Sequence, residues 1–303
     1  TIAEAEVEKE KLNVDMYALN NRVNDLYFGI LLLDEQIKQN TLLQDELERN
    51  YRQITAYVEN GIANQADLDA VKVEQLNTKQ KRVDLVSSRA AYLKMLSLLV
   101  GEALSPETVL EKPVPQSMVS AVSEIRRPEL ALFDAQGAGL QVQEKALNVR
   151  HLPQFGLFVQ GAYGNPGLNM LKNEFSPYYM AGVRLSWDFG SLYTLKNDRR
   201  VIEKKRQQLD NNRDVFLFNT RLEMTQQDQA IHSLEKQMRD DDEIIRLRTN
   251  IRKAAEAKVA NGTLTVTEML RELTNESLAR QSKAMHEIQR LMGIYQLKYT
   301  IND

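Results

Sequence analysis

Residues 58–68 read Val-Glu-Asn-Gly-Ile-Ala-Asn-Gln-Ala-Asp-Leu, and residues 259–269 read Val-Ala-Asn-Gly-Thr-Leu-Thr-Val-Thr-Glu-Met. The two stretches align without a gap and share the valine, the asparagine, the glycine and an acidic residue followed by an apolar one. An Asn-Gly pair favours the left-handed backbone that ends a helix and begins a tight turn. Two such turns, 201 residues apart, indicate an internal duplication of a helix–turn–helix unit.

The sequence on either side of these turns suits very long helices. All seven prolines fall between residues 106 and 177, and a proline inside a helix costs about 3 kcal/mol. Two heptad stripes run from residue 12 to residue 58, and twelve of their fourteen positions are apolar; the exceptions are Asn40 and Gln44. A similar stripe from residue 217 to residue 259 is interrupted by Arg252. A seven-residue period held this long indicates a left-handed supercoil.

We therefore predict helices over residues 2–59, 65–99, 191–260 and 265–298, with each pair folded back at its Asn-Gly turn. At 1.5 Å per residue, the first and third of these helices would measure roughly 85 Å and roughly 105 Å. Such lengths are too great for a compact domain of this size. A further helix is predicted from Pro128 to about His151, because proline is favoured in a first helical turn.

Residues 152–190 have a different pattern. Apolar residues alternate with small or polar ones over residues 155–164 and again over residues 179–189, which is the period of a β-strand. The second run places Tyr179, Trp187 and Phe189 on its apolar face. We predict one β-hairpin with strands of about ten residues. A lone hairpin is marginal in water, so its apolar face must cover the helices as a small α+β cap, or face lipid in a transmembrane barrel with the aromatic residues at the membrane interface.

Composition excludes several classes of function. The absence of cysteine removes disulfides, thiolate metal sites and thiol nucleophiles, and a net charge of −3 gives no basic footprint for nucleic acid. His151, His232 and His286 lie far apart in sequence, and we find no catalytic or phosphate-binding motif. The acidic run at 240–243 is interpreted as a solvated helix face. We expect no enzyme, no metal site and no cofactor.

Three further motifs have the same order and spacing as in a known family. They are Arg-Pro-Glu-Leu at 127–130, which opens a repeat; Leu-Pro-Gln-Phe at 152–155, which enters a strand; and Leu-Ser-Trp-Asp-Phe-Gly at 185–190, which leaves one for a long helix. Together with the two Asn-Gly turns they resemble the TolC-type outer-membrane efflux family over nearly the whole chain. The family has a β-hairpin in each half, but only the second half has one here. The resemblance thus implies an N-terminally incomplete member.

The resemblance implies a mainly α-helical homotrimer in the outer membrane that extends into the periplasm. Residues 1–100 and 191–303 would be the two long-helix hairpins of a periplasmic α-barrel, residues 101–151 a Pro-rich connection with a short helix, and residues 152–190 the outer-membrane barrel strands. The protein would be a passive export conduit of a tripartite system with an inner-membrane pump. Docking of a periplasmic adaptor on the tips at Asn60, Gly61, Asn261 and Gly262 would open it, as helices slide along apolar heptad seams.

The resemblance also implies a gate at the tips. The family's gate acid, six residues after each tip glycine, matches Asp67 and Glu268, whereas its second acid falls on Arg271. A ring of three Glu268 side chains would favour cations in a narrow pore. Alternatively, Asp67 and Glu268 only stabilise the first turns of their helices through the helix dipole.

Two other positions depart from the family's gate. Its arginine and tyrosine fall on Leu264 and Val259, so the specific latch is not carried over. The competing interpretation of the whole chain is a soluble helical scaffold, or a periplasmic adaptor with a coiled-coil hairpin. An adaptor would carry several short strands around one helical hairpin, and a scaffold does not explain the alternating aromatic strands.

Overall fold

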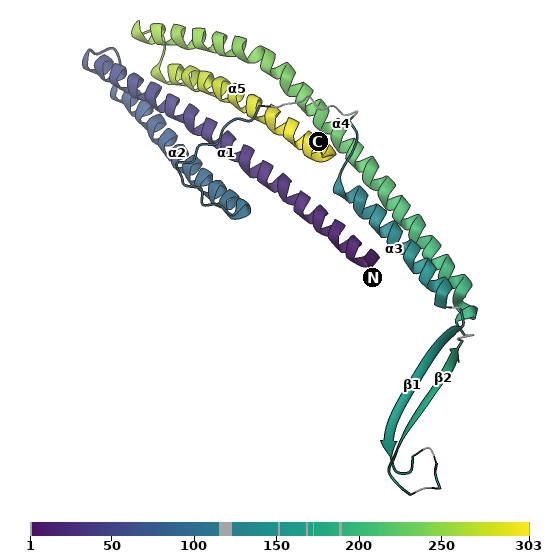
Figure 1. Ribbon diagram of the computed structural model, residues 1–303. Helices are drawn as coiled ribbons and strands as arrows, with labels where there is room; N and C mark the ends of the chain where they lie inside the picture. Colours follow the sequence, from purple (N-terminus) through teal and green to yellow (C-terminus); the bar gives the residue numbers. More distant parts are fainter. Residues whose placement is uncertain are drawn as a thin grey trace. The chain divides into compact units, whose positions relative to one another are not determined.

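The computed structural model describes residues 2–114, 123–150, 152–167, 169–171, 173–187 and 190–302. Within these residues the elements follow in the order α1 (Ile2–Glu59), α2 (Gln65–Val100), α3 (Pro128–Arg150), β1 (Gln154–Gly164), β2 (Ser176–Ser186), α4 (Gly190–Ala260) and α5 (Val266–Ile301) (Figure 1). The predicted fold class of very long paired helices with one β-hairpin is confirmed. The ends of the four long helices lie within three residues of their predicted positions.

The chain divides into two compact units. The hairpin unit contains residues 1–13 and 128–216, which include α3 and both strands, and the tip unit contains residues 14–127 and 217–303, which include α2 and α5. Helices α1 and α4 contribute residues to both units.

Three clusters of buried side chains join neighbouring helices in the tip unit. One joins α1 to α2, one joins α1 to α5, and one joins α4 to α5, so the packing order is α2, α1, α5, α4 (Figure 1). Each fully buried aliphatic or aromatic side chain contributes about 1.5–3 kcal/mol. The members are, cluster by cluster, Leu26, Ile30, Leu93 and Leu96; Phe28, Leu31 and Ile288; and Met224, Ile231, Leu297 and Ile301.

A fourth cluster lies next to the two turns and draws on all four helices. It gathers apolar positions of α1 and α4 from just before each turn and apolar positions of α2 and α5 from just after it, so the tips share one core. Its buried members are Leu47, Ile54, Val71, Ala255, Val259, Val266, Met269, Leu270 and Leu273.

The two polar positions in the first heptad stripe form a hydrogen-bonded layer between α1 and α2. Asn40 Nδ2 donates to the carbonyl oxygen of Thr78 at 3.1 Å. Gln44 Nε2 donates to the same oxygen at 3.3 Å and to Asn40 Oδ1 at 3.1 Å. Because their donors find acceptors, these amides interrupt the apolar stripe without the cost of an unpaired polar group.

The seam between α4 and α5 is more polar than the heptad pattern predicted. Ion pairs and hydrogen bonds cross it at four levels between the tip cluster and the α4–α5 cluster. The expectation of an apolar seam is therefore wrong for this pair, and sliding of α4 along α5, which stays a prediction, would have to break these contacts. The pairs are Arg290 with Glu235 at 2.9 Å, His286 with Asp241 at 2.9 Å, Lys283 with Asp242 at 2.5 Å, and Arg252 with Glu276 at 2.5 Å.

One of these contacts corrects the interpretation of the acidic run at 240–243 as a solvated face. Asp241 is 5% exposed and faces His286, whose Nδ1 lies 2.9 Å from Asp241 Oδ2. The other members are exposed, so the interpretation holds for them. The run alone cannot show that two of its four carboxylates, those of Asp241 and Asp242, bond to side chains of α5.

In the hairpin unit, α3 and α4 pack through a ring contact and polar pairs. The rings of Phe133 and Phe216 lie 5.9 Å apart between centroids. Arginines of α4 reach polar side chains of α3 at three successive levels, which aligns the two helices. The pairs are Arg213 with Asp134 at 3.0 Å, Arg206 with Glu144 at 2.8 Å, and Arg199 with Asn148 at 2.7 Å.

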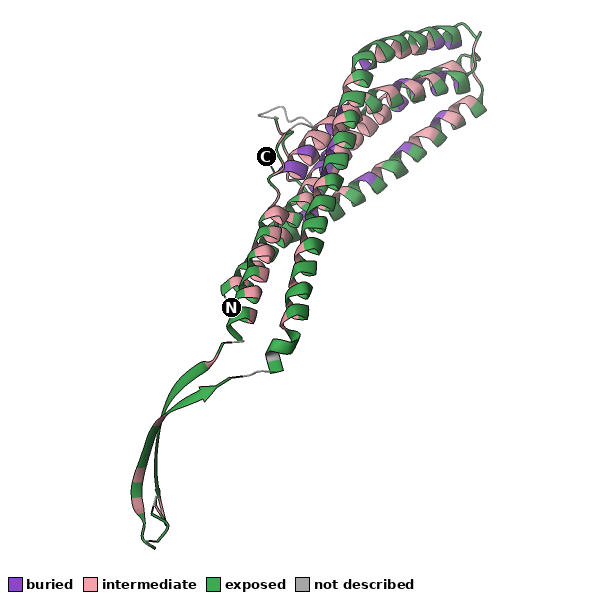
Figure 2. Ribbon diagram, turned by 90° about the vertical axis from the view of Figure 1, so that its right-hand side faces the viewer, coloured by how far each residue is buried: buried purple, intermediate pink, exposed green. Residues whose placement is uncertain are grey.

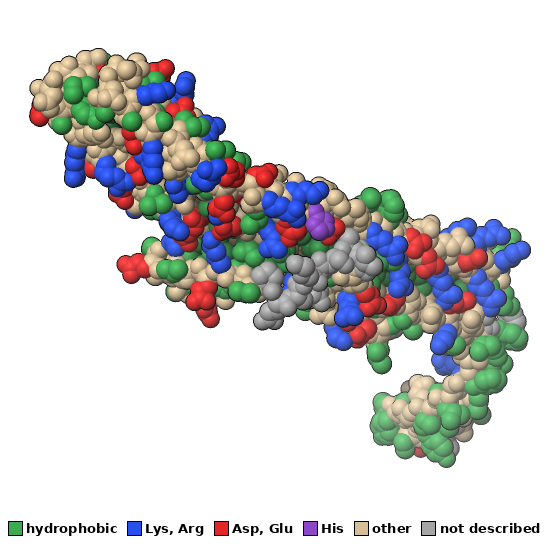
Figure 3. Space-filling view, turned by 90° about the horizontal axis from the view of Figure 1, so that it is seen from above, with side chains coloured by type: hydrophobic (Ala, Val, Ile, Leu, Met, Phe, Trp, Pro, Cys, Tyr) green, Lys and Arg blue, Asp and Glu red, His purple; other side chains and the backbone are tan. Residues whose placement is uncertain are grey.

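The two strands form an antiparallel hairpin whose apolar face is uncovered. Leu157 pairs with Val183 and Val159 with Ala181, so the apolar positions of both strands share one face. Seven large side chains on this face are each at least 58% exposed, and hydrophobic side chains mark the hairpin in the space-filling view (Figures 2 and 3). This exposure contradicts the interpretation of the hairpin as a cap packed on the helices. The seven are Phe155, Leu157, Val159, Tyr163, Tyr179, Val183 and Leu185.

The second strand is displaced from its predicted range of 179–189. It ends at Ser186, because Ser186 pairs with Gln154, the first residue of β1. At the other end, pairing with β1 extends the strand back to Ser176, which the alternation did not show. Trp187 therefore lies just beyond the strand and is 46% exposed, and the predicted interfacial Phe189 lies outside the described residues.

Candidate gate at the helix tips

The same backbone hydrogen bonds close both tips. Gly61 and Gly262 have φ of +73° and +67°, and no atom lies within 4 Å of the place where a Cβ would stand. The left-handed backbone, rather than lack of space, therefore requires glycine here. The bonds in the first tip run from Gly61 N to Val58 O (3.1 Å) and from Ile62 N to Tyr57 O (2.8 Å), and in the second from Gly262 N to Val259 O (2.9 Å) and from Thr263 N to Lys258 O (2.9 Å).

The tip asparagines complete the ends of the long helices. Asn60 Nδ2 donates to Ala56 O at 2.7 Å, and Asn261 Nδ2 donates to Ala257 O at 2.9 Å. Each carbonyl also accepts the backbone N–H of the same asparagine, at 3.1 Å and 3.2 Å, so the side chain adds a second hydrogen bond at the helix end. Both asparagines and both tip glycines are exposed.

The two predicted gate acids are capping residues. Asn64 caps α2, and its side chain accepts from Asp67 N at 3.0 Å while Asp67 Oδ2 accepts from Asn64 N at 3.1 Å. Thr265 caps α5 in the same way, with both distances to Glu268 at 3.2 Å. These are two complete capping boxes. Asp67 and Glu268 thus have a local structural role that involves direct hydrogen bonds, beyond the helix dipole.

The side chain of Glu268 is exposed, and hydrogen bonds favour its ionised form. The Thr265 hydroxyl donates to Glu268 Oε2 at 2.9 Å, and this bond is the largest cause of a lowered pKa for the Glu268 carboxyl. The Thr265 backbone N–H and the charge of Arg271 lower the pKa further. Arg271 is itself exposed, and its Nε lies 3.5 Å from Glu272 Oε1. The structure therefore places Arg271 near Glu268, on the first turns of α5.

The two positions that depart from the family's latch belong to the tip core. Val259 is a buried member of the tip cluster, and Leu264 packs against that cluster. Apolar side chains in this setting close the tip by packing, whereas polar ones would need partners.

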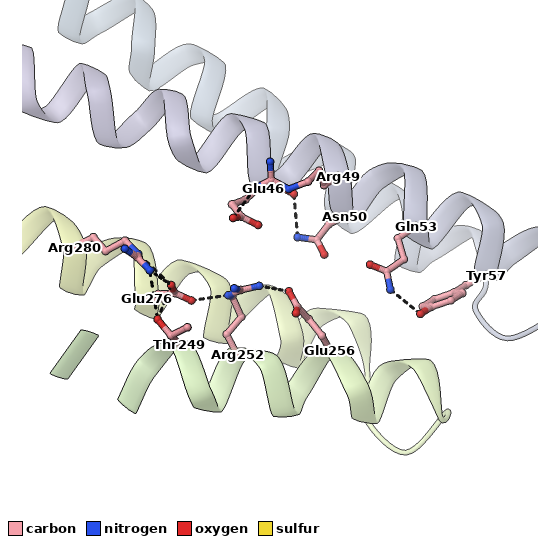
Figure 4. Close-up of polar contacts among 10 residues, drawn as sticks. All are labelled: Glu46, Arg49, Asn50, Gln53, Tyr57, Thr249, Arg252, Glu256, Glu276 and Arg280. Atoms are coloured by element: carbon pink, nitrogen blue, oxygen red, sulfur yellow. Dashed lines mark hydrogen bonds and ion pairs between the residues drawn. The ribbon is translucent and has the colours of Figure 1, made fainter. Parts of the chain in front are cut away.

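A buried polar network lies behind the tip core, and the sequence analysis did not find it (Figure 4). Glu276 of α5 is 5% exposed and accepts hydrogen bonds from Thr249 at 2.8 Å, Arg252 at 2.5 Å and Arg280 at 2.6 Å. Arg252 also binds Glu256. Burial acts to raise the pKa of Glu276, but these donors outweigh it and the pKa is lowered. The signal in the sequence was Arg252, the charged residue in an apolar stripe.

Helix α1 presents a second polar group toward this network. Arg49 pairs with Glu46 at 2.5 Å, and Asn50 donates to the carbonyl oxygen of Glu46 at 3.0 Å. Figure 4 shows the α1 group and the α4–α5 network on facing helices. A cavity of about 300 Å³ between them is lined by residues of both, including Arg49, Arg252 and Glu276.

No group of three or more His, Asp or Glu side chains is placed to hold a metal ion in the part of the chain described. Over the same residues, no helix has both the length and the hydropathy that a membrane-spanning helix requires.

Comparisons with known proteins place this arrangement among solved folds. No protein-family model and no curated protein sequence matches the chain. Among solved structures, the chain is similar to the outer membrane protein VceC of Vibrio cholerae (11% identity, TM-score 0.81, 99% of this chain and 73% of VceC). It is also similar to CusC (15%, 0.81, 99% and 72%) and to the CmeC outer membrane channel of Campylobacter jejuni (10%, 0.76, 99% and 65%). The chain therefore has the fold of the TolC-type outer-membrane channels, as the sequence motifs predicted, over nearly all of its length.

Proposed function

We propose that this chain is the outer-membrane channel component of a tripartite efflux or secretion system, located in the outer membrane and extending into the periplasm. The observation that carries the proposal is the match of 99% of the chain to outer-membrane channels at TM-scores up to 0.81. In this function the protein is a passive conduit, not an enzyme, and needs no cofactor. An inner-membrane pump supplies the energy.

The hairpin suits a place in a membrane barrel. Its strands are eleven residues long, and a transmembrane strand needs about 9–11 residues. One face is apolar and exposed over its whole length, while the other carries Gln160 and Arg184, as expected of lipid-facing and lumen-facing sides. Because one chain supplies two described strands, a closed barrel requires further copies, and a homotrimer is the proposed assembly.

The tips suit a gate that a partner protein opens. Asn60, Gly61, Asn261 and Gly262 are exposed at two structurally equivalent turns, which would dock the hairpins of a periplasmic adaptor. The hydrogen bonds from Thr265 that lower the pKa of Glu268 favour its ionised form. A ring of three such carboxylates would repel anions from the pore.

Conductance in a planar bilayer tests the proposal directly. The purified protein should form cation-selective channels, and Glu268→Lys should move the reversal potential toward anion selectivity. Lys258→Glu is a matched control on the α4 side of the same tip. A protein that does not conduct even with an adaptor docked on its tips would overturn the channel function, whereas conductance with an unchanged reversal potential in Glu268→Lys would remove only Glu268 from the pore.

The alternative as an adaptor or a soluble scaffold has less support. Among the described residues the strands are β1 and β2 alone, whereas an adaptor would carry several more. A soluble scaffold would leave the apolar face of the hairpin in water, and a patch of that kind marks an interaction surface.

A further inference from the structure

The face of the hairpin opposite its apolar face is not uniformly small and polar. Besides Gln160 and Arg184 it carries Phe158 and Met180, because side chains alternate between the faces and Gln160 pairs with Met180. Phe158 is 37% exposed and Met180 is 40% exposed, whereas the seven large side chains of the apolar face are each at least 58% exposed. Two large apolar side chains are thus partly covered on the face that the alternation reserves for polar ones.

Arg184 lies over the ring of Phe158. Its guanidinium carbon is 5.5 Å from the centroid of the ring, which is the distance of a cation–π contact. Gly182 gives the ring its place, because a Cβ on Gly182 would stand 3.0 Å from two ring carbons of Phe158. Gly156 pairs with Arg184 and adds no side chain beside the guanidinium. The ring and the cation are therefore the groups that this part of the face presents.

The rest of the hairpin offers little negative charge to Arg184. Arg184 is exposed, and the single carboxylate among the described residues from 152 to 187 is Glu174, ten residues earlier in the loop between the strands. A guanidinium that stacks on a ring keeps its N–H donors in its own plane, where they match a carboxylate, sulfonate or phosphate in two parallel hydrogen bonds. The stacked position thus fixes a cation without using up its donors.

From these contacts we propose that Arg184, Phe158 and Met180 form a binding site for organic anions. Arg184 binds the acidic group, and the two apolar side chains contact the carbon skeleton. The inference rests on the proposed function, because it takes this face of the hairpin to line the lumen of a barrel. It adds a chemical preference to the conduit: amphipathic compounds with a carboxylate or sulfonate group bind there, whereas inorganic anions find only the charge.

Block of the conducting channel in a planar bilayer tests the site. The probe is naphthalenesulfonate, and inorganic sulfate is the comparison. Both are added on the side of the bilayer that the loop of the hairpin faces, so that they reach Arg184 without passing the acidic residues of the tips. We expect naphthalenesulfonate to reduce the conductance of the native channel at concentrations at which sulfate has no effect.

Four variants separate charge, hydrogen bonding and ring. Arg184→Gln should raise the half-blocking concentration of naphthalenesulfonate by roughly threefold or more, as expected for the loss of an exposed ionic contact. Arg184→Lys keeps the charge without the planar fork and should lose less, and Phe158→Leu should also weaken the block. The matched control, Arg200→Gln, removes an equal charge from an exposed position of α4 and should keep the native value.

The outcomes distinguish this site from the channel function. If the channel conducts but naphthalenesulfonate blocks Arg184→Gln as it blocks the native protein, the site is wrong while the channel function stands. Equal block by sulfate would show that the charge acts alone and would overturn the organic-anion site. If Arg184→Gln does not reach the outer membrane, native block in both Arg184→Lys and Phe158→Leu would overturn it. A native protein that does not conduct even with an adaptor docked would overturn the proposed function and this site with it.

Discussion

At the scale of single residues, the tip glycines are required by their backbone and not by neighbouring atoms. We predict that Gly262→Ala destabilises the protein by about 1–2 kcal/mol, because a Cβ is disfavoured at φ of +67°. Gly262→Asn should cost less, because asparagine tolerates the left-handed region. Denaturant unfolding followed by circular dichroism measures both. Equal losses in the two variants would contradict the backbone explanation.

A second residue-scale prediction separates the two roles of Glu268. Glutamine also completes a capping box, so Glu268→Gln, which removes the charge, should lower the melting temperature less than Glu268→Ala does. Cation selectivity should fall in both variants if the side chain lines the pore. If cation selectivity falls in Glu268→Ala but is kept in Glu268→Gln, which also lacks the charge, capping is the sole role of Glu268.

The same lowered pKa predicts a pH response. The folded-state pKa of Glu268 lies below its ordinary value because of the Thr265 hydrogen bonds. Its stabilising contribution is therefore present above that ordinary value, about 4.3, and is lost as pH falls through the lowered folded value. Cation selectivity should stay constant from pH 7 to pH 5. A decline within that range, measured by reversal potentials, would mean that another group controls selectivity.

The sequence was least informative about the burial and contacts of single side chains. Leu12 and Met16 continue the apolar stripe of α1 yet are about 60% exposed, while Asp241 is buried within an acidic run. Heptad position predicts that a residue faces some partner helix, but not whether that helix belongs to the same chain. The capping boxes were visible only as an acid after each turn, because their hydrogen bonds depend on the backbone of the turn.

At the scale of elements, each helix hairpin is tied internally by polar contacts. Between α1 and α2 these include Arg89 with Asp34 and the layer around Thr78, and between α4 and α5 they include the pairs of Glu276 and Asp241. The clusters shared by α1 and α5 are apolar. Period and turn residues therefore predicted the helices and their hairpins, but the polar ties needed knowledge of which faces meet.

The network at Glu276 gives the prediction for this scale. Because Glu276 is 5% exposed, Glu276→Ala leaves Arg252 with only part of its partners and should cost about 3–5 kcal/mol. The double variant Arg252→Met, Glu276→Met should recover much of that loss, since it removes both buried charges and takes these partners only from the more exposed Glu256 and Arg280. Unfolding free energies in a double-mutant cycle measure the coupling. Additive losses would show that the pair does not act as a unit.

The network should also respond to pH in a defined direction. The hydrogen bonds from Arg280, Arg252 and Thr249 outweigh the effect of burial and lower the pKa of Glu276. Its contribution is thus present above the ordinary glutamate pKa and lost as pH falls through the lowered value. The stability difference between native protein and Glu276→Ala should accordingly persist at pH 5 and shrink at lower pH.

At the scale of the whole molecule, the hairpin decides whether the helices are anchored in a membrane. Val159 lies on its exposed apolar face, and the adjacent Gln160 lies on the opposite face. In a barrel, Val159→Arg would put a charge against lipid, which costs about 2–4 kcal/mol per copy near the bilayer midplane, so the variant should be lost from urea-washed outer membranes. Gln160→Arg would face the lumen and should remain there at the native level and conduct. Equal retention of the two variants would show that this face does not meet lipid, and the helices would then need another anchor.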